Sequence, residues 1–181
     1  PLMAEEVRKW MSRHAKNAKN LASYKIPKLA ELLLRDSLVS EVERWYRPDH
    51  IFMDGSPLLN MAAWAGLYHE EFFTKETCAR AIDILSGRDN CIKRDPILRQ
   101  FPELSALRRL RFNHLDLPDA IVFLDVEPEV SISRIESRGE EVQAHENVEK
   151  LRKLRAAYHV VCDAIEERRP VLRMDGSKSL D

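Results

Sequence analysis

The chain has 181 residues, a formal net charge of −1 and an ordinary composition, with 44% hydrophobic and 33% charged residues. This length suits one domain that buries a core without covalent cross-links. The near-zero charge excludes a general electrostatic attraction to nucleic acid or to a membrane surface. No apolar run reaches the roughly 18 residues of a membrane helix. The three cysteines are far apart and predict neither a zinc site nor a disulfide framework.

The cellular compartment and the extent of the chain are predicted from its cysteines and its ends. An odd number of cysteines without a signal peptide indicates a reducing environment, so we expect a cytoplasmic protein. The printed sequence starts at Pro1 in mid-segment and stops at Asp181, just as a helical pattern begins. We therefore expect further residues on both sides of a single domain over residues 1–181.

A basic segment lies near the start of the chain. Residues 8–28 contain seven Lys or Arg and no acidic residue. Such a segment could bind nucleotide phosphates, or nucleic acid through counterion release. It could equally form the solvated face of a helix.

Helical periodicity covers much of the remaining chain. Pro48 should end the first long helix, and the polar residues 87–96 indicate a loop between two shorter ones. The predicted helices cover residues 28–46, 76–86, 103–112 and 146–167.

Three short apolar runs, each followed by an aspartate, predict buried strands. They cover residues 51–53, 120–124 and 171–174, and the aspartates are Asp54, Asp125 and Asp175. Short strands that alternate with helices favour an α/β fold with a parallel sheet and helices on both faces. Functional residues in such sheets gather where the strands end, which makes the aspartates candidates. Asp125 suits a structural role better, because it can fix the turn after its strand.

One segment carries a specific motif. Residues 118–139 read P-D, an apolar strand, L-D-V-E-P-E, and a helix that ends R-I-E-S-R-G. This pattern resembles the thymidylate kinase family and its deoxynucleoside kinase relatives. Residues 54–66, DGSPLLNMAAWAG, resemble the family's D-R-Y-x-x-S-x-x-A-Y-Q-G with one extra residue.

The resemblance implies a P-loop kinase-like fold with three α/β/α layers. It implies transfer of a phosphoryl group from ATP, with Mg²⁺, to a nucleoside monophosphate or a deoxynucleoside. Residues 67–117 would be a helical insertion, and residues 134–158 a lid-like segment with the helix that follows it. The resemblance is also compatible with a homodimer. Neither nucleic acid nor a membrane is expected as a partner.

The resemblance also implies roles for charged residues. Asp54 would hold the metal or accept a proton, because a carboxylate at a strand end can do either; alternatively it caps the following helix. Arg134 and Arg138 lie four residues apart on one helix face and would bind phosphate oxygens as lid arginines. Otherwise they form a solvated helix end.

Substrate and nucleotide contacts fall on five further residues. Asn60 matches a family Ser and Trp64 a family Tyr, so both are candidate substrate residues, although a Trp on an apolar helix face more often belongs to the core. Arg35 could replace the family's acceptor-binding arginine, which falls at Leu38. Ser177 and Lys178 lie in a turn that in the family approaches the adenine of ATP.

The chain also departs from the family. Gly55 and Val142 stand where the family has arginines, and no G-x-x-x-x-G-K-[ST] phosphate loop occurs. In the resembled fold the strand before that loop lies between the strands predicted at 51–53 and 120–124. We therefore expect these 181 residues alone not to transfer phosphate. The alternatives are a catalytically inactive nucleotide-binding pseudokinase and a nucleic-acid-binding module that uses residues 8–28.

Overall fold

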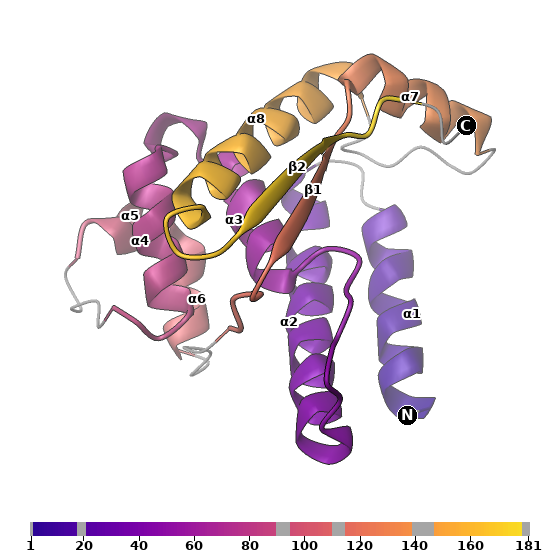
Figure 1. Ribbon diagram of the computed structural model, residues 1–181. Helices are drawn as coiled ribbons and strands as arrows, with labels where there is room; N and C mark the ends of the chain where they lie inside the picture. The colour runs from indigo at the N-terminus through magenta and orange to yellow at the C-terminus, as the bar shows by residue number, and fades with distance from the viewer. Residues whose placement is uncertain (1, 18–20, 90–94, 110–114, 139–146, 179–181) are drawn as a thin grey trace.

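The structure is a computed structural model that describes residues 2–17, 21–89, 95–109, 115–138 and 147–178 (Figure 1). Helices dominate, and two strands cross the front of the molecule in Figure 1. In chain order the elements are α1 (Leu2–Lys16), α2 (Leu21–Tyr46), α3 (Pro57–Tyr68), the 3₁₀ turn η1 (Glu70–Phe72), α4 (Lys75–Leu85), α5 (Ile97–Gln100), α6 (Pro102–Arg109), β1 (Ile121–Asp125), α7 (Pro128–Ser137), α8 (Val148–Ile165) and β2 (Val171–Asp175).

The two strands pair in parallel, as the sequence predicted for residues 120–124 and 171–174. The register runs from Ile121 opposite Val171 to Asp125 opposite Asp175, so both strands end at the same edge. Parallel strands need a long crossover, and α7 and α8 provide it. The two aspartates predicted to gather at the strand ends are therefore neighbours.

Helix α8 covers one face of this small sheet. Phe123 of β1 stacks on Tyr158 with ring centroids 6.1 Å apart, and it meets His159 edge-on at 5.2 Å. On the opposite face, Val122, Leu124, Leu172 and Met174 are between 48% and 60% exposed. The prediction of helices on both faces is therefore wrong for the described part of the chain. The apolar runs indicated strands that can be buried on both sides, but no described helix reaches the second side.

The predicted strand at 51–53 is also wrong. These residues are irregular, and Phe52 is 94% exposed. A strand exists only through hydrogen bonds to a neighbour. The two-stranded sheet contains β1 and β2 alone, so nothing described pairs with this segment. Its position beside β1 still shapes the candidate site.

The predicted helices are present, with shifted ends. Helix α2 begins at Leu21, seven residues before its predicted start, and ends at Tyr46, before Pro48. Helix α8 begins after Asn147, whose side chain accepts a hydrogen bond from the backbone N–H of Lys150 at 3.0 Å. Helix α4 begins with a capping box formed by Thr74 and Thr77. Among the described helices, none combines the length and apolar composition that a membrane crossing requires.

Helix α3 lies at the centre of the core. It packs against α2 on one side and α8 on the other, and Leu58 and Ala63 are fully buried. The approach to α8 is close at Gly66, because a Cβ there would lie 2.7 Å from the Cβ of Ala157. Helices α3 and α8 thus form a fixed frame for the side chains at their ends.

Candidate functional site

A groove of about 700 Å³ runs beside β1. Its walls come from α2, from the turn at residues 53–56 with the first turn of α3, from β1 and from α8. Three predicted site residues, Arg35, Asp54 and Asn60, line this groove together. They are 25 residues apart at most, and the fold brings them to one place.

The turn that carries Asp54 depends on Gly55. Gly55 has φ of +76°, a left-handed conformation that other residues adopt only with strain. A Cβ at Gly55 would lie 2.9 Å from Nδ2 of Asn60. The arginine that the resembled family has at this position would therefore strain the backbone of this turn and displace the amide of Asn60. Helix α3 then begins at Ser56 and Pro57, and Ser56 makes no side-chain capping bond.

Asp54 presents an exposed carboxylate to the groove. Within the described residues, its side chain makes no hydrogen bond or ion pair. Asp54 does not cap helix α3, which was its alternative role, because the N-cap residue of this helix is Ser56. The carboxylate of Asp54 is therefore available to a metal ion or a proton.

Arg35 reaches the same turn from α2. Its Nη1 donates hydrogen bonds to the backbone oxygens of Asp54 at 2.9 Å and Gly55 at 3.3 Å. No carboxylate of the described chain pairs with this guanidinium. The remaining N–H donors of Arg35 can therefore bind an anion in the groove.

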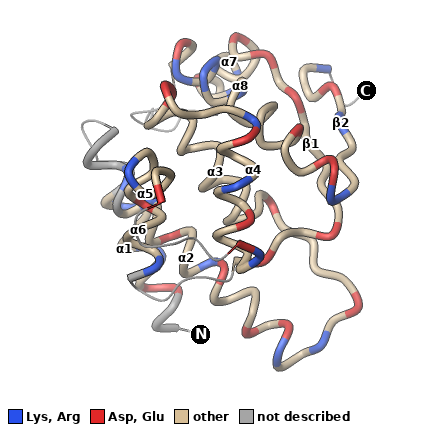
Figure 2. The backbone as a smooth tube through the Cα atoms, turned by 90° about the vertical axis from the view of Figure 1, so that its left-hand side faces the viewer, with Lys and Arg blue, Asp and Glu red and all other residues tan. Residues whose placement is uncertain are grey.

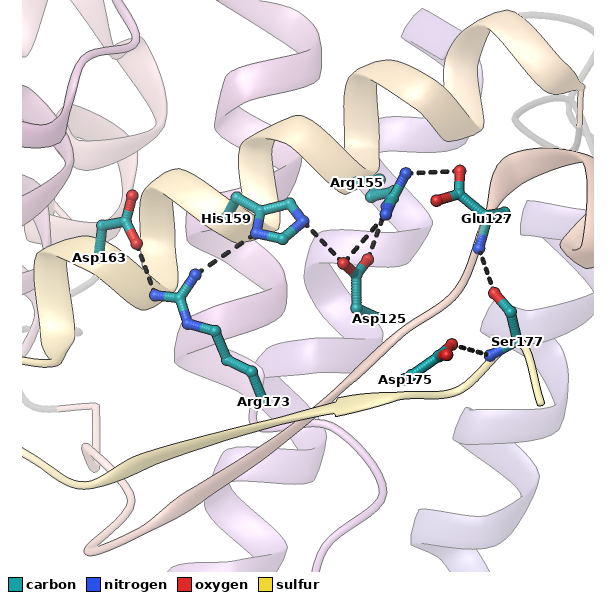
Figure 3. A network of polar contacts seen from close by, with 8 residues as sticks. All are labelled: Asp125, Glu127, Arg155, His159, Asp163, Arg173, Asp175 and Ser177. Carbon is teal, nitrogen blue, oxygen red and sulfur yellow. Dashed lines mark hydrogen bonds and ion pairs between the residues drawn. The ribbon is translucent and has the colours of Figure 1, made fainter.

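Two other charged side chains of the groove, Asp125 and Arg155, are paired with each other (Figure 3). Arg155 of α8 holds Asp125 with two hydrogen bonds, from Nε at 2.6 Å and Nη2 at 3.0 Å, and Glu127 with a third at 2.7 Å. His159 lies 3.2 Å from the same aspartate. This network ties the end of β1 to α8, which agrees with a structural role for Asp125. Sequence reasoning missed Arg155, because a single arginine on the polar flank of a helix gives no signal.

The bond from Arg155 lowers the pKa of Asp125 below its ordinary value of 3.8, with a smaller contribution from His159. A depressed pKa stabilises the folded state above the unfolded pKa, and this contribution is lost as the pH falls through the folded pKa. We therefore expect Asp125→Asn to lower the melting temperature at neutral pH. The gap to the wild type should narrow below about pH 4.

Circular dichroism melting over a pH series measures that gap. Asp119→Asn is the matched control, because Asp119 is an almost fully exposed partner of Arg169, and exposed ion pairs contribute little. A gap that stays constant with pH would show that the charge of Asp125 is not what stabilises the fold.

The turn after β2 is closed by its own contacts. The carboxylate of Asp175 accepts from the backbone N–H of Ser177 at 3.0 Å, and the Ser177 hydroxyl accepts from the backbone N–H of Glu127 at 2.9 Å. Lys178 is exposed, 3.5 Å from Asp175. Ser177 and Lys178, predicted to approach adenine, thus lie at the strand ends but outside the groove. Their contact with a nucleotide stays a prediction.

The two predicted lid arginines lie apart from Asp54. Arg134 donates to the backbone oxygen of Gly176 at 2.8 Å and lies 3.4 Å from that of Lys178, so it holds the turn after β2 to α7. Arg138 is the C-cap residue of α7. Neither lines the groove. Residues 139–146, which include Val142, lie outside the described residues, so the lid over 134–158 stays a prediction.

Trp64 is separated from the groove. It is buried and lines a different cavity, of about 60 Å³, between α2, α3 and α6. Its ring centroid lies 5.9 Å from that of Tyr68. The structure therefore does not bring Trp64 together with Asp54 and Asn60, and the core interpretation of this residue fits its place.

The basic segment at 8–28 is partly neutralised. Lys9 pairs with Glu5 and Glu6. Lys25 pairs with Glu103, and Lys28 with Glu31. Figure 2 shows acidic and basic residues interspersed along the chain rather than gathered on one element. The nucleic-acid alternative stays untested, but the segment is not a uniform cationic face.

Comparison with known proteins gives one partial match. A segment of 69 residues, 38% of this chain, is 36% identical to the deoxyadenosine kinase of Dictyostelium discoideum. The match covers 28% of that protein's length. No protein-family model matches the chain, and no solved structure matches it. Part of the chain is thus similar to a deoxynucleoside kinase. None of these comparisons supports a relationship to the thymidylate kinases in particular.

Proposed function

We propose that this chain forms the acceptor side of a kinase that phosphorylates a deoxynucleoside, and that the groove beside β1 is the acceptor site. The supporting observation is that Asp54 and Arg35 bring two opposite, uncommitted charges into one groove. Lys28, Asp125 and Arg155, the other charged residues of its lining, are committed to ion pairs. The partial similarity to a deoxyadenosine kinase favours a nucleoside as the acceptor. A nucleoside monophosphate of the thymidylate type is the alternative acceptor.

The chemistry of such a transfer suits these two residues. Phosphoryl transfer is catalysed mainly by positioning and by stabilising negative charge. Asp54 would accept the proton of the attacking hydroxyl or hold Mg²⁺, and Arg35 would bind an oxygen of the acceptor or of the transferred group.

ATP and Mg²⁺ are the cofactors we propose. No group of three or more His, Cys, Asp or Glu side chains in the described residues could hold a metal ion. Mg²⁺ nevertheless needs only one or two protein carboxylates, because it keeps waters and substrate phosphates as its other ligands. Asp54 fits that requirement. When bound, the metal would neutralise charge on the phosphates.

A second candidate is a pseudokinase that binds nucleoside or nucleotide without turnover. Gly55 favours it, because it replaces an arginine that would bind phosphate in the resembled family, and its left-handed conformation suits glycine. The two functions differ in turnover, so transfer of labelled phosphate from ATP to deoxyadenosine by the full-length protein separates them.

Binding of deoxyadenosine tests what both candidates share. We expect the 181-residue protein to bind it in isothermal titration calorimetry, and Arg35→Gln to weaken binding about tenfold, which corresponds to one lost charge-assisted hydrogen bond. The matched control is Arg44→Gln, because Arg44 lies on the same helix but stacks on Trp45 outside the groove. Absent binding, or equal losses from both variants, would rule out the groove as the acceptor site.

A further inference from the structure

Helices α3 and α8 meet at a hydrogen bond in the wall of the groove. The hydroxyl of Tyr158, on α8, donates to Oδ1 of Asn60, in the first turn of α3, at 2.6 Å. Both residues line the groove.

The length of this bond indicates which way the amide of Asn60 faces, because 2.6 Å is short for N–H···O and ordinary for O–H···O. A primary amide accepts through its oxygen and donates through its nitrogen. Because Oδ1 is bound to the phenol, Nδ2 is directed at Gly55, and it is the atom nearest to where a Cβ of Gly55 would lie. The missing side chain of Gly55 therefore leaves space for this amide.

The two N–H donors of Asn60 have no hydrogen-bond partner in the described part of the chain. They lie against the Asp54–Gly55 turn, whose backbone oxygens are bound by Arg35. A free amide donor beside a free carboxylate and a guanidinium is suited to an oxygen atom of a ligand. An apolar ligand would leave the amide donors and the carboxylate without partners.

Tyr158 is itself firmly held. Its ring stacks on Phe123 with an interplanar angle of 24°. Burial raises the pKa of Tyr158 to about 12. The phenol thus keeps its proton, and can donate it to Oδ1 of Asn60, across the physiological pH range.

We propose that Tyr158 is a positioning residue, which acts through Asn60 and directs its amide donors at an oxygen of the acceptor nucleoside. The identity of that ligand rests on the proposed function, whereas the orientation of the amide does not. Loss of the phenol hydroxyl would let the amide rotate and present its oxygen to the groove.

A double-mutant cycle tests this coupling, with deoxyadenosine as the probe and calorimetry as the readout. Tyr158→Phe removes only the hydroxyl and should weaken binding by about threefold to tenfold, the effect of one neutral hydrogen bond. Asn60→Ala should weaken binding at least as much. In the Asn60→Ala background, Tyr158→Phe should have no further effect, because the side chain through which it acts is gone. Tyr46→Phe, at an exposed tyrosine of α2, is the control.

Additive losses would overturn the proposal, since a merely structural Tyr158 would weaken binding with or without Asn60. A second readout needs no ligand. The side-chain amide signals of Asn60 in the ¹⁵N–¹H spectrum should shift in Tyr158→Phe and stay in place in Tyr46→Phe. Unchanged signals in both variants would also overturn it. If the wild type fails to bind deoxyadenosine while the signals shift, the proposed function fails and the positioning role stands.

Discussion

Asp54→Asn should lower the rate of phosphoryl transfer by the full-length protein by about two to four orders of magnitude, the range for removing a general base. The carboxylate faces the groove without a partner in the described residues, so the substitution breaks no structural contact. It replaces a charged acceptor of protons or metal by a neutral amide of the same shape. The melting temperature should therefore stay unchanged while turnover of ATP and deoxyadenosine is lost.

Asp49→Asn is the matched control, because Asp49 lies five residues earlier, is exposed and does not line the groove. A rate for Asp54→Asn close to that of the wild type would remove this residue from the chemistry. A wild type that binds deoxyadenosine without turnover would instead support the pseudokinase alternative. A comparison of Mg²⁺ dependence between wild type and variant would then show whether Asp54 acts through the metal.

Gly66→Ala should destabilise the fold by about 1 to 3 kcal/mol, the typical cost of overpacking a core. Helix propensity alone predicts the opposite, since alanine is favoured over glycine inside a helix by about 1 kcal/mol. The steric term should prevail because the new Cβ would lie 2.7 Å from the Cβ of Ala157 and 2.8 Å from the ring of Phe73. Helices α3 and α8 would have to separate, which would also lengthen the bond between Tyr158 and Asn60.

The exchange Gly66→Ala with Ala157→Gly provides the control. The exchange keeps one alanine and one glycine in the two helices, so the changes in helix propensity at the two positions nearly cancel. It also removes the contact between the two Cβ atoms. Urea unfolding should show the double variant to be more stable than the sum of the single effects. Stabilisation by Gly66→Ala alone would mean that the two helices approach less closely than described.

The periodic parts of the fold were predictable from the sequence. Strands β1 and β2 were found within one residue, because a short apolar run ending at an aspartate has few alternatives. Their parallel pairing followed from the helices between them. The start of α2 was missed because Pro27 lies inside this helix, whereas a proline more often stands in the first turn of a helix. The prediction of a strand at 51–53 was wrong because an apolar run does not show whether a neighbouring strand exists to pair with it.

The candidate site was only partly predictable. Asp54 and Asn60 could be found because they lie in one continuous motif, and Arg35 because it is a single turn from an expected arginine position. Arg155 and Tyr158 could not be found in this way. Their roles depend on which side of α8 meets β1 and α3, and periodicity does not assign a partner to a polar atom. From the sequence, Gly55 is only a departure from an arginine of the family; its left-handed conformation and its closeness to the amide of Asn60 depend on the three-dimensional structure.

One face and both edges of the two-stranded sheet are not covered by any helix or strand among the described residues, which has a consequence for handling the protein. Two strands alone are marginal in water, and edge strands with free N–H and C=O groups are templates for pairing with other chains. Val122, Leu124, Leu172 and Met174 add an apolar surface at the same place. When concentrated, these 181 residues should self-associate through strands β1 and β2 before they unfold, so loss of native signal on heating would report aggregation as well as unfolding.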